Sequence, residues 1–406
     1  MPLISKKGTF MLLLIFTVVF LVKCMDSKKI STDPRGVEYA GAGSCRSCHQ
    51  AVYDSFRLTS HHAATAPGDP ALVKGSFLEG KNSFAFDDNR QVKMEKRGGR
   101  LYQVLYKDGK EKEAHPFDIS FGSKNAQTWL YWSGNNTYQL PISFYTSVNN
   151  WGTSPGYSIL YPSFDRLIGR NCFECHSSHI GFLHGADSSP LTTNNPQKRE
   201  EMDRRSLVTG IDCERCHGPA REHVNYHAQN PGQSQGRFIT RILGMSRQQQ
   251  LDACAVCHSG NDRVKKKSRF AFRPGDTLSH FFGSLMDSII KTEPDVHGNQ
   301  YGLLTESRCF IQSLQLTCNT CHDPHRDSPS NLAIYSAKCV GCHPVGSPAF
   351  CTVQSPGADV LVQNCIDCHM PNQPSSAISF QLSGSTQRYS YYLRTHRIGV
   401  YHLETK

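Results

Sequence analysis

The chain has 406 residues, which is long for one compact domain and fits two. Only 38% of these residues are hydrophobic, so apolar side chains alone would leave a core of ordinary size underfilled. The formal net charge of +10 would suit a nucleic acid or an anionic membrane, but three of the lysines, Lys6, Lys7 and Lys23, lie in a segment typical of export signals. The charge therefore gives no positive sign of a nucleic-acid partner, and we expect none.

The N-terminus has the features of a secretory leader. Two lysines precede Phe10–Val22, an apolar run whose length suits a signal peptide better than a membrane span. Cys24 follows directly, in surroundings that resemble a bacterial lipoprotein box, except that Lys23 stands where a small residue is usual. We expect residues 1–24 to be a signal peptide or lipoprotein leader, and the protein to be exported to the periplasm or cell envelope. Lipidation of Cys24, an uncleaved anchor and simple cleavage are open alternatives.

Cysteine is unusually frequent, and its spacing is regular. Of the 17 cysteines, all but three belong to seven Cys-x-x-Cys-His motifs. In such a motif the two cysteines form thioethers to a porphyrin, and the adjacent histidine ligates the iron from the proximal side. The motifs are Cys45-Cys48-His49, Cys172-Cys175-His176, Cys213-Cys216-His217, Cys254-Cys257-His258, Cys318-Cys321-His322, Cys339-Cys342-His343 and Cys365-Cys368-His369.

Paired cysteines can also bind zinc or form disulfides. A zinc ribbon uses Cys-x-x-Cys pairs but does not require a histidine after each of them. Here a histidine follows every pair, which excludes zinc binding and disulfides for the set as a whole. The sequence therefore predicts seven covalently bound c-type haems with their iron. The porphyrins would also fill the interior, and their propionates would pair with many of the lysines and arginines.

The motifs divide the chain into regions. The first motif stands alone, and the other six follow closely after a long stretch without a motif. We expect a first region, 25–170, with one haem and a haem-free β-rich insert. A six-haem region, 171–373, follows it. Residues 374–406 are expected to form a C-terminal tail that supplies a distal histidine.

Local patterns predict the elements of the first region. Residues 50–62 are expected to be helical, because their apolar side chains share one face. Residues 83–145 alternate or are rich in β-formers and predict a small antiparallel sheet, in which Asp108-Gly109 marks a hairpin turn. Aromatic residues, including all three tryptophans, crowd Trp129–Tyr161, and we expect them to pack the sheet against haems.

The six-haem region is expected to consist of short helices and loops wrapped around porphyrins. Residues 206–211, 245–254 and 278–290 are helix candidates. The polar segment after Pro371 predicts a loop as far as Tyr391. Together these expectations give a mainly α fold with extensive loops around the haems and a small antiparallel β insert after the first haem.

Histidine is also the expected ligand on the distal side of each iron. Twelve of the 19 histidines lie outside the motifs, whereas three of the eight methionines lie in or beside the leader. His179 and His325 each follow a proximal histidine by three residues, so each is better placed to reach a neighbouring haem than its own. Histidine on both sides closes both axial positions, which favours electron transfer over substrate binding. The predicted distal ligands are His61, His179, His223, His297, His325 and His396.

Three cysteines lie outside the motifs. If Cys24 is lipidated or removed, Cys309 and Cys351 remain as a pair. An oxidising compartment would favour a disulfide between them. Two free thiols are an equal alternative.

Several segments resemble a known group of exported multihaem cytochromes, those related to the tetrahaem partner of hydroxylamine oxidoreductase. The stretch from Tyr39 to His61 is similar to the opening of these proteins, and so are Cys-His-Gly-Pro before His223 and Cys-His-Asp-Pro-His325. The segment from Leu130 to Gly156 resembles the haem-free insert of uncharacterised members. The resemblance implies a distal-ligand role for His61. No Cys-x-x-Cys-Lys occurs, which argues against a pentahaem nitrite reductase but not against a hydroxylamine-oxidoreductase-like site.

Two functions follow from these expectations. The first is a heptahaem cytochrome that carries electrons between redox partner proteins of the cell envelope, with membrane attachment through a lipid on Cys24 or through the N-terminal apolar segment. It needs no substrate pocket, so no catalytic residue is predicted. The alternative is a multihaem oxidoreductase that acts on a small nitrogen or sulfur compound at one open haem. A scaffold or filament subunit would instead require exposed haems at both ends of the series.

Overall fold

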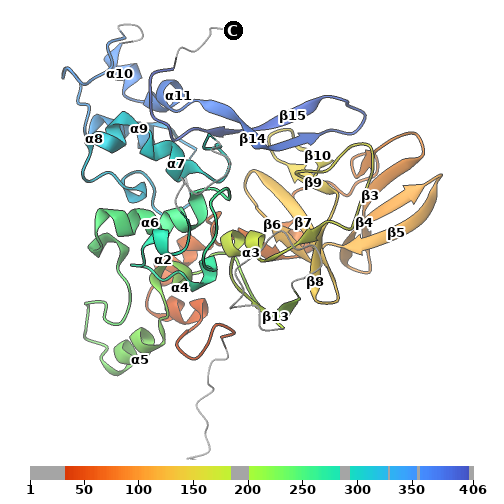
Figure 1. Ribbon diagram of the computed structural model, residues 1–406, viewed down its shortest axis with the longest axis horizontal. Helices are drawn as coiled ribbons and strands as arrows, with labels where there is room; N and C mark the ends of the chain where they lie inside the picture. Colours follow the sequence, from red (N-terminus) through yellow and green to blue (C-terminus); the bar gives the residue numbers. More distant parts are fainter. Residues whose placement is uncertain (1–32, 184–200, 284–292, 328–329, 354–356, 402–406) are drawn as a thin grey trace, which may run out of the picture.

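The described part of the chain is discontinuous. The computed structural model describes residues 33–183, 201–283, 293–327, 330–353 and 357–401 (Figure 1). The predicted leader at residues 1–24, including Cys24, lies outside the described residues. Within those residues, we find no helix that is both long and apolar enough to cross a membrane.

The predicted mainly α fold is wrong. Helix and strand each make up 26% of the chain, and the strands form several antiparallel sheets. In Figure 1 most of the strands lie on the right and most of the short helices lie on the left. The helices are short because several of them contain little more than one attachment motif, such as α4 (Cys213–His217) and α11 (Cys365–His369).

The first predicted helix is shorter than expected. We predicted helix over residues 50–62, but α2 ends at Phe56. The Thr59 hydroxyl donates to the Phe56 carbonyl (2.7 Å) and accepts from the His62 amide (3.2 Å), so a turn replaces the last part of the helix. The elements of this segment are η1 (Ala42–Ser47), α2 (Gln50–Phe56), β1 (Thr65–Pro67) and η2 (Pro70–Leu72).

A four-stranded antiparallel sheet begins the β-rich part, in the order β2-β3-β4-β5. The hairpin turn at Asp108-Gly109 lies where the sequence predicts it. Asp108 and Gly109 adopt φ values of +52° and +69°, the left-handed conformation that a tight hairpin requires. The strands are β2 (Ser83–Ala85), β3 (Arg90–Arg97), β4 (Arg100–Lys107) and β5 (Lys110–Pro116).

A second, seven-stranded sheet packs against the first, so the β-rich part is larger than the small insert that we predicted. Its main path is β1-β6-β7-β8-β11, and β9 joins both β7 and β10. The pairings are antiparallel throughout. The remaining strands are β6 (Ile119–Phe121), β7 (Ala126–Ser133), β8 (Asn136–Gln139), β9 (Ile142–Tyr145), β10 (Asn150–Thr153) and β11 (Leu167–Ile168).

The aromatic residues fill the core of this β-rich part. Trp129 and Trp151 are buried in one cluster with Phe117, whose ring centroid lies 4.7 Å from that of Trp129. The Trp151 indole also donates to the Ser76 carbonyl (3.0 Å). We expected these rings to pack the sheet against haems. Trp129 and Trp151 pack against apolar side chains of the two sheets, whereas Trp132 packs against a cluster that includes Phe173 of α3 (Arg170–His176). The β-rich part therefore has a conventional core of its own.

The region from residue 170 to 258 alternates attachment motifs with other elements. The predicted helix at 206–211 is wrong, because most of it lies in β13, which pairs with β12. The Ser206 hydroxyl accepts from the Gly181 amide (2.6 Å), which fixes that pairing. The elements are α3 (Arg170–His176), β12 (Ser177–Phe182), β13 (Met202–Thr209), α4, α5 (Arg221–Gln229), η4 (Ile242–Gly244) and α6 (Arg247–His258).

The predicted helix at 245–254 is present as α6, which a capping box of Ser246 and Gln249 begins. Of the predicted helix at 278–290, the structure has only the short turn η6, and residues 284–290 lie outside the described part. The other elements here are η5 (Arg269–Ala271), η6 (Leu278–His280), α7 (Gln300–Thr305), α8 (Arg308–Gln312), η8 (Cys318–Thr320), α9 (Ala333–Val340) and α10 (Ala358–Leu361).

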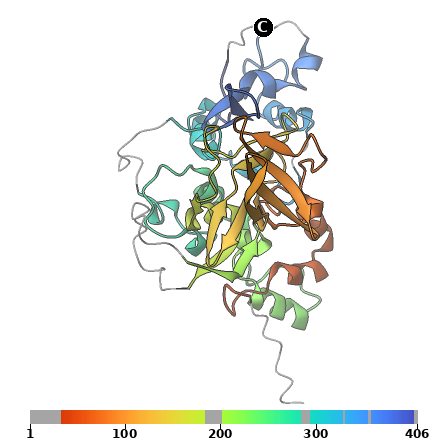
Figure 2. The ribbon, with the colours of Figure 1, turned by 90° about the vertical axis from the view of Figure 1, so that its right-hand side faces the viewer.

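The C-terminal segment is a β-hairpin, although we predicted a loop as far as Tyr391. It consists of β14 (Asn372–Gln381) and β15 (Arg388–Arg394). Phe380 stacks on Tyr145 of β9 with ring centroids 3.8 Å apart. This apolar contact holds the hairpin against the β-rich part, so that it bridges the two halves of the molecule (Figures 1 and 2).

Candidate haem-binding site

Each attachment motif forms one helical turn. Residues three and four positions apart are neighbours on a helix, so the spacing of the motif places both cysteines and the histidine on one face. Four motifs lie in α3, α4, α6 and α11. In the other three, the histidine amide donates to the carbonyl of the first cysteine, from His49 to Cys45 (2.9 Å), His322 to Cys318 (3.0 Å) and His343 to Cys339 (2.8 Å).

Four proximal histidines lie opposite four histidines from outside the motifs. Segments far apart in the sequence supply the two members of each pair, so tertiary structure and not local spacing brings them together. The pairs, with the distance between ring centroids, are His49 with His223 (6.3 Å), His258 with His61 (6.1 Å), His217 with His325 (5.8 Å) and His322 with His396 (5.9 Å).

The separation within these pairs matches two imidazoles that share one iron. A metal–imidazole bond measures about 2.0–2.1 Å, which puts the ring centroids on opposite sides of one metal about 6 Å apart. Direct packing of two rings would allow a closer approach, as for His115 and Tyr131 at 4.1 Å. The four pairs therefore fit a haem iron held on both sides by histidine.

His176 and His297 form a fifth candidate pair. Burial lowers the pKa of His176, and the charge of nearby His297 lowers this pKa further. Burial also lowers the pKa of His297. The two imidazoles therefore lie within electrostatic reach of each other and both favour the neutral form.

The protonation of the histidines suits metal ligation, which requires a neutral imidazole with a free nitrogen lone pair. Burial lowers the pKa of His258 to about 4 and that of His396 to about 4. Elsewhere, a backbone carbonyl within 2.7–2.8 Å holds the proton on Nδ1 and leaves Nε2 for the metal. The histidines with this contact are His217, His223, His343 and His369.

Cysteines of different motifs lie in contact with one another. In four pairs the thiol of one cysteine shifts the pKa of the other, and in each pair the two cysteines belong to different motifs. Because each cysteine carries one edge of its porphyrin, these contacts identify attachment sites that are neighbours in space. The pairs are Cys45 with Cys213, Cys175 with Cys257, Cys254 with Cys318 and Cys339 with Cys365.

Comparisons with known proteins agree with the motifs at a coarse level. No family model matches the chain. A curated relative, the multiheme cytochrome MtrA of Shewanella baltica (strain OS185), is 26% identical over 180 residues, which cover 39% of this chain and 53% of the relative. The chain thus spans about half the length of that relative. This similarity supports the interpretation of the chain as a multihaem c-type cytochrome.

A solved structure also resembles the chain. The crystal structure of the outer cell wall cytochrome OcwA aligns with a TM-score of 0.48 and 18% sequence identity, over 85% of this chain and 79% of the other.

The structure places the remaining predicted ligands differently. His179 lies on β12, with its ring 5.6 Å from Phe270, and it lines a cavity between β12 and the 266–274 segment. Its ligand role stays a prediction. His343 and His369 are not among the five pairs in the described part of the chain. Cys309 and Cys351 are free thiols in the structure rather than a disulfide.

Sequence reasoning missed a buried charge cluster beside the third motif. The Arg35 guanidinium donates to Asp33, Asp212 and Glu214 at 2.8–3.1 Å, and all four side chains are at most 8% exposed. Asp212 also caps α4 by accepting from the Arg215 amide (2.9 Å). An aspartate directly before the motif was the available signal, because it is a favoured N-cap residue.

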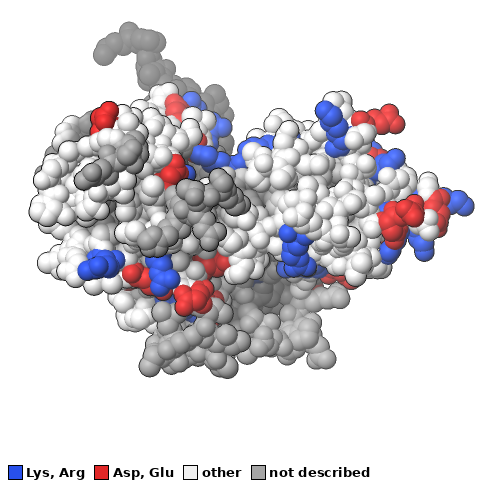
Figure 3. Space-filling view, turned by 90° about the horizontal axis from the view of Figure 1, so that it is seen from above, with Lys and Arg blue, Asp and Glu red and all other residues white. Residues whose placement is uncertain are grey.

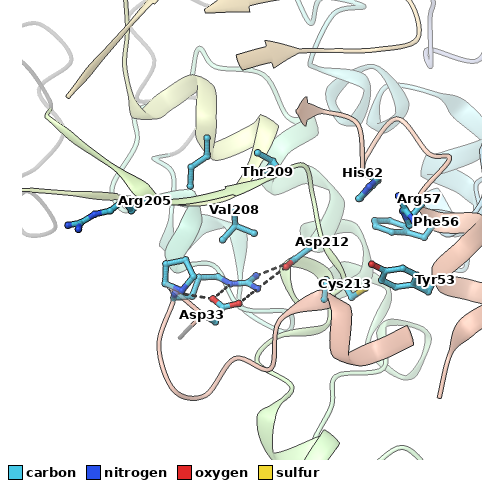
Figure 4. A pocket seen from close by; sticks show the side chains of 14 residues that line it. Asp33, Tyr53, Phe56, Arg57, His62, Arg205, Val208, Thr209, Asp212 and Cys213 are labelled. Carbon is cyan, nitrogen blue, oxygen red and sulfur yellow. Dashed lines mark hydrogen bonds and ion pairs between the residues drawn. The ribbon is translucent and has the colours of Figure 1, made fainter. Parts of the chain in front are cut away.

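A cavity of about 340 Å³ lies next to this cluster (Figure 4). Figure 4 shows His62 and Tyr53 on one side of it and Asp33 on the other, with Cys213 between them. Cys213 and His62 both line this space, which lies beside the third motif. His61, the neighbour of His62, instead faces His258 of the fourth motif.

The surface carries charges of both signs. On the face shown in Figure 3, basic and acidic side chains are interspersed, and the tip of the four-stranded sheet shows both. Arg97, the last residue of β3, pairs with Glu95 and Glu111, each at 2.8 Å.

Proposed function

We propose that this protein is a heptahaem c-type cytochrome that carries electrons between redox partners of the cell envelope. The observation that supports this most strongly is the set of histidine pairs. Four proximal histidines face a second histidine at the separation of a shared iron, and His176 and His297 lie close enough to form a fifth pair. Iron with histidine on both sides has no free position for a substrate, which favours electron transfer.

The haem group would supply reversible one-electron oxidation of iron, and the chain would supply position and environment. The histidine pairs would fix both axial ligands. Backbone carbonyls that accept from Nδ1 would orient two of these rings, those of His217 and His223, and leave Nε2 for the metal. Burial around His258 would limit access of water and so influence the reduction potential of its iron.

The cysteine contacts support a continuous series of attachment sites. Numbered along the chain, the thiol contacts link site 1 to 3, site 2 to 4, site 4 to 5 and site 6 to 7. Longer-range electrostatic interactions connect Cys216 with Cys257, and Cys321 with Cys339, which joins site 3 to 4 and site 5 to 6. The proposed order in space is therefore 1-3-4-5-6-7, with site 2 attached at site 4.

The location and attachment of the protein are part of the same proposal. Covalent haem attachment occurs outside the cytoplasm, which agrees with the predicted leader at residues 1–24. A lipid on Cys24 or a retained apolar segment would hold the cytochrome at a membrane, close to its redox partners.

Low-temperature electron paramagnetic resonance of the purified, oxidised protein tests the proposal. Spectra are recorded with and without cyanide or nitrite, after the haem content has been counted. An electron carrier should give low-spin signals that the added ligand leaves unchanged. A high-spin signal that the ligand removes would contradict the proposal and favour an oxidoreductase with one open haem.

A further inference from the structure

A second cavity, of about 680 Å³, lies between β12, α4 and residues 266–274. We propose that this cavity binds a small oxyanion, such as inorganic phosphate, from solution. The lining contains none of the attachment cysteines or proximal histidines. His179 is the one predicted distal ligand that lines the cavity, and this proposal assigns it to the anion site instead of to a haem. The argument rests on the position of the cavity, on its charge and on its access to solvent.

The cavity lies on the side of α3 and α4 that faces away from their attachment cysteines and histidines. On α4 the attachment residues share one face, and Glu214 and Arg215 lie on the opposite face, toward the cavity. On α3, Arg170 lies one helical turn before Glu174, again on the face away from the attachment residues, and it lines the same cavity. The haems of the second and third motifs are therefore attached on the other sides of these helices.

The lining has an excess of positive charge. Arg35 and Arg273 are neutralised by carboxylates within 3.1 Å, and Glu214 is occupied by Arg35 and by three backbone amides. Within the described residues, Arg215, Lys266 and Lys267 form no ion pair with a carboxylate. A cavity with three such cations attracts an anion, and its volume lies in the range of small-molecule sites.

Arg215 is placed to orient the anion. Its Nη2 donates to the Arg269 carbonyl (2.7 Å), which fixes the guanidinium, and its Nε is buried without a hydrogen-bond partner among the described residues. A planar guanidinium that retains donors is suited to an oxyanion. Lys266 and Lys267 are exposed, so they would lie at the entrance and attract the ligand from solvent.

Isothermal titration calorimetry with inorganic phosphate tests this site on the seven-haem protein at fixed ionic strength. We expect one saturable site in the wild type. Arg215→Gln should weaken binding about tenfold, because it removes a charge-assisted hydrogen bond. Lys266→Gln/Lys267→Gln should weaken binding about threefold, the size of a screened surface interaction.

Lys107→Gln/Lys110→Gln is the matched control. It also removes two positive charges, but at the β4–β5 hairpin. It should bind phosphate as the wild type does. If Arg215→Gln loses the third haem, the lysine variant decides the outcome. The proposal is overturned if the wild type shows no saturable phosphate binding. It is also overturned if Lys266→Gln/Lys267→Gln and Lys107→Gln/Lys110→Gln bind phosphate with equal affinity. A structure of the haem-loaded protein with a propionate of a haem in this cavity would overturn it as well.

Discussion

The β-rich part and the haem-binding part of this molecule build their interiors in different ways. In the β-rich part, one cluster of buried side chains, among them Phe84, Trp129 and Leu140, fills the space between the two sheets. In the haem-binding part, the buried apolar side chains form smaller separate clusters, such as the one around Phe272 and Phe281. The same part contains histidine pairs, such as His49 with His223 and His61 with His258, whose ring centroids lie 6.3 and 6.1 Å apart. One interior is thus complete in the chain, and under the proposed function the porphyrins would complete the other.

This difference separates the origins of stability in the two parts. Apolar side chains that pack against each other stabilise a fold without any cofactor. Two histidine rings that are separated by the space for one iron stabilise the fold only when the iron is bound, because metal binding then contributes to folding. The two parts should therefore respond differently to the loss of a haem and to the loss of a core side chain.

The largest effect is expected from the loss of the fourth attachment site. Cys254→Ala/Cys257→Ala removes the site that contacts both the second and the fifth. The haem-binding part should lose most of its helical structure, because His61 and His258 would face each other without their iron. Circular dichroism and the count of bound haems measure this outcome.

The control for this variant is Cys351→Ala, which removes an exposed cysteine outside the motifs. It should retain seven haems and the wild-type spectrum. A Cys254→Ala/Cys257→Ala protein with six haems and unchanged helical content would contradict the idea that the porphyrins complete this interior.

A core substitution in the β-rich part should lower the stability of that part without changing the number of haems. Trp129 is fully buried, so Trp129→Ala should lower the free energy of unfolding of this part by about 3–5 kcal/mol. The number of haems and their absorption should not change. Denaturation is followed by tryptophan fluorescence, since all three tryptophans lie in this part.

Tyr161→Ala is the matched control for the core substitution, because Tyr161 is 65% exposed. Its effect should stay within about 0.5 kcal/mol. Loss of haem absorption in Trp129→Ala would show that the two interiors are not independent.

A smaller effect, limited to one haem, is expected from a distal ligand. His61→Ala should convert one of the seven irons to a high-spin form, because it opens the axial position opposite His258. The neighbouring His62→Ala is a close control and should leave the spin state of that iron unchanged. The readout is electron paramagnetic resonance of the oxidised variants, and equal spectra for the two would remove His61 from the ligand set.

The smallest effect is expected at a turn. Gly109 has a φ of +69°, and a Cβ at this position would meet no atom within 4 Å. Gly109→Ala should therefore cost about 1 kcal/mol from backbone strain alone. Gly232 also has open space around it but lacks a positive φ, so Gly232→Ala should not destabilise the protein. Equal unfolding free energies for the two variants would contradict the role of the turn.

The sequence predicts local features of this fold much better than the fold class. Asp108-Gly109 identified a hairpin because only a few residues accept a positive φ. The mainly α prediction failed because each motif specifies one helical turn and no more, as α4 shows. The β14–β15 hairpin was missed because its stability depends on Phe380 stacking on Tyr145, more than 200 positions away.

In the candidate site, too, the sequence predicts the local features better than those that depend on distant residues. The proximal ligands can be read from the sequence, because covalent attachment fixes the spacing of cysteine and histidine. The partner of each one depends on tertiary structure, so that the sequence named His61 as a ligand but not its position opposite His258. The cluster around Arg35 joins residues that are distant in sequence, and only the N-cap position of Asp212 gave a local signal.

An experimental structure of the protein with its haems bound tests the central claim most directly. We predict iron between His61 and His258 and between the two members of each of the three other pairs, with the attachment sites in the order 1-3-4-5-6-7 and site 2 beside site 4. An iron at Cys254 and Cys257 with a distal ligand other than His61, or a first site remote from the third, would contradict the account.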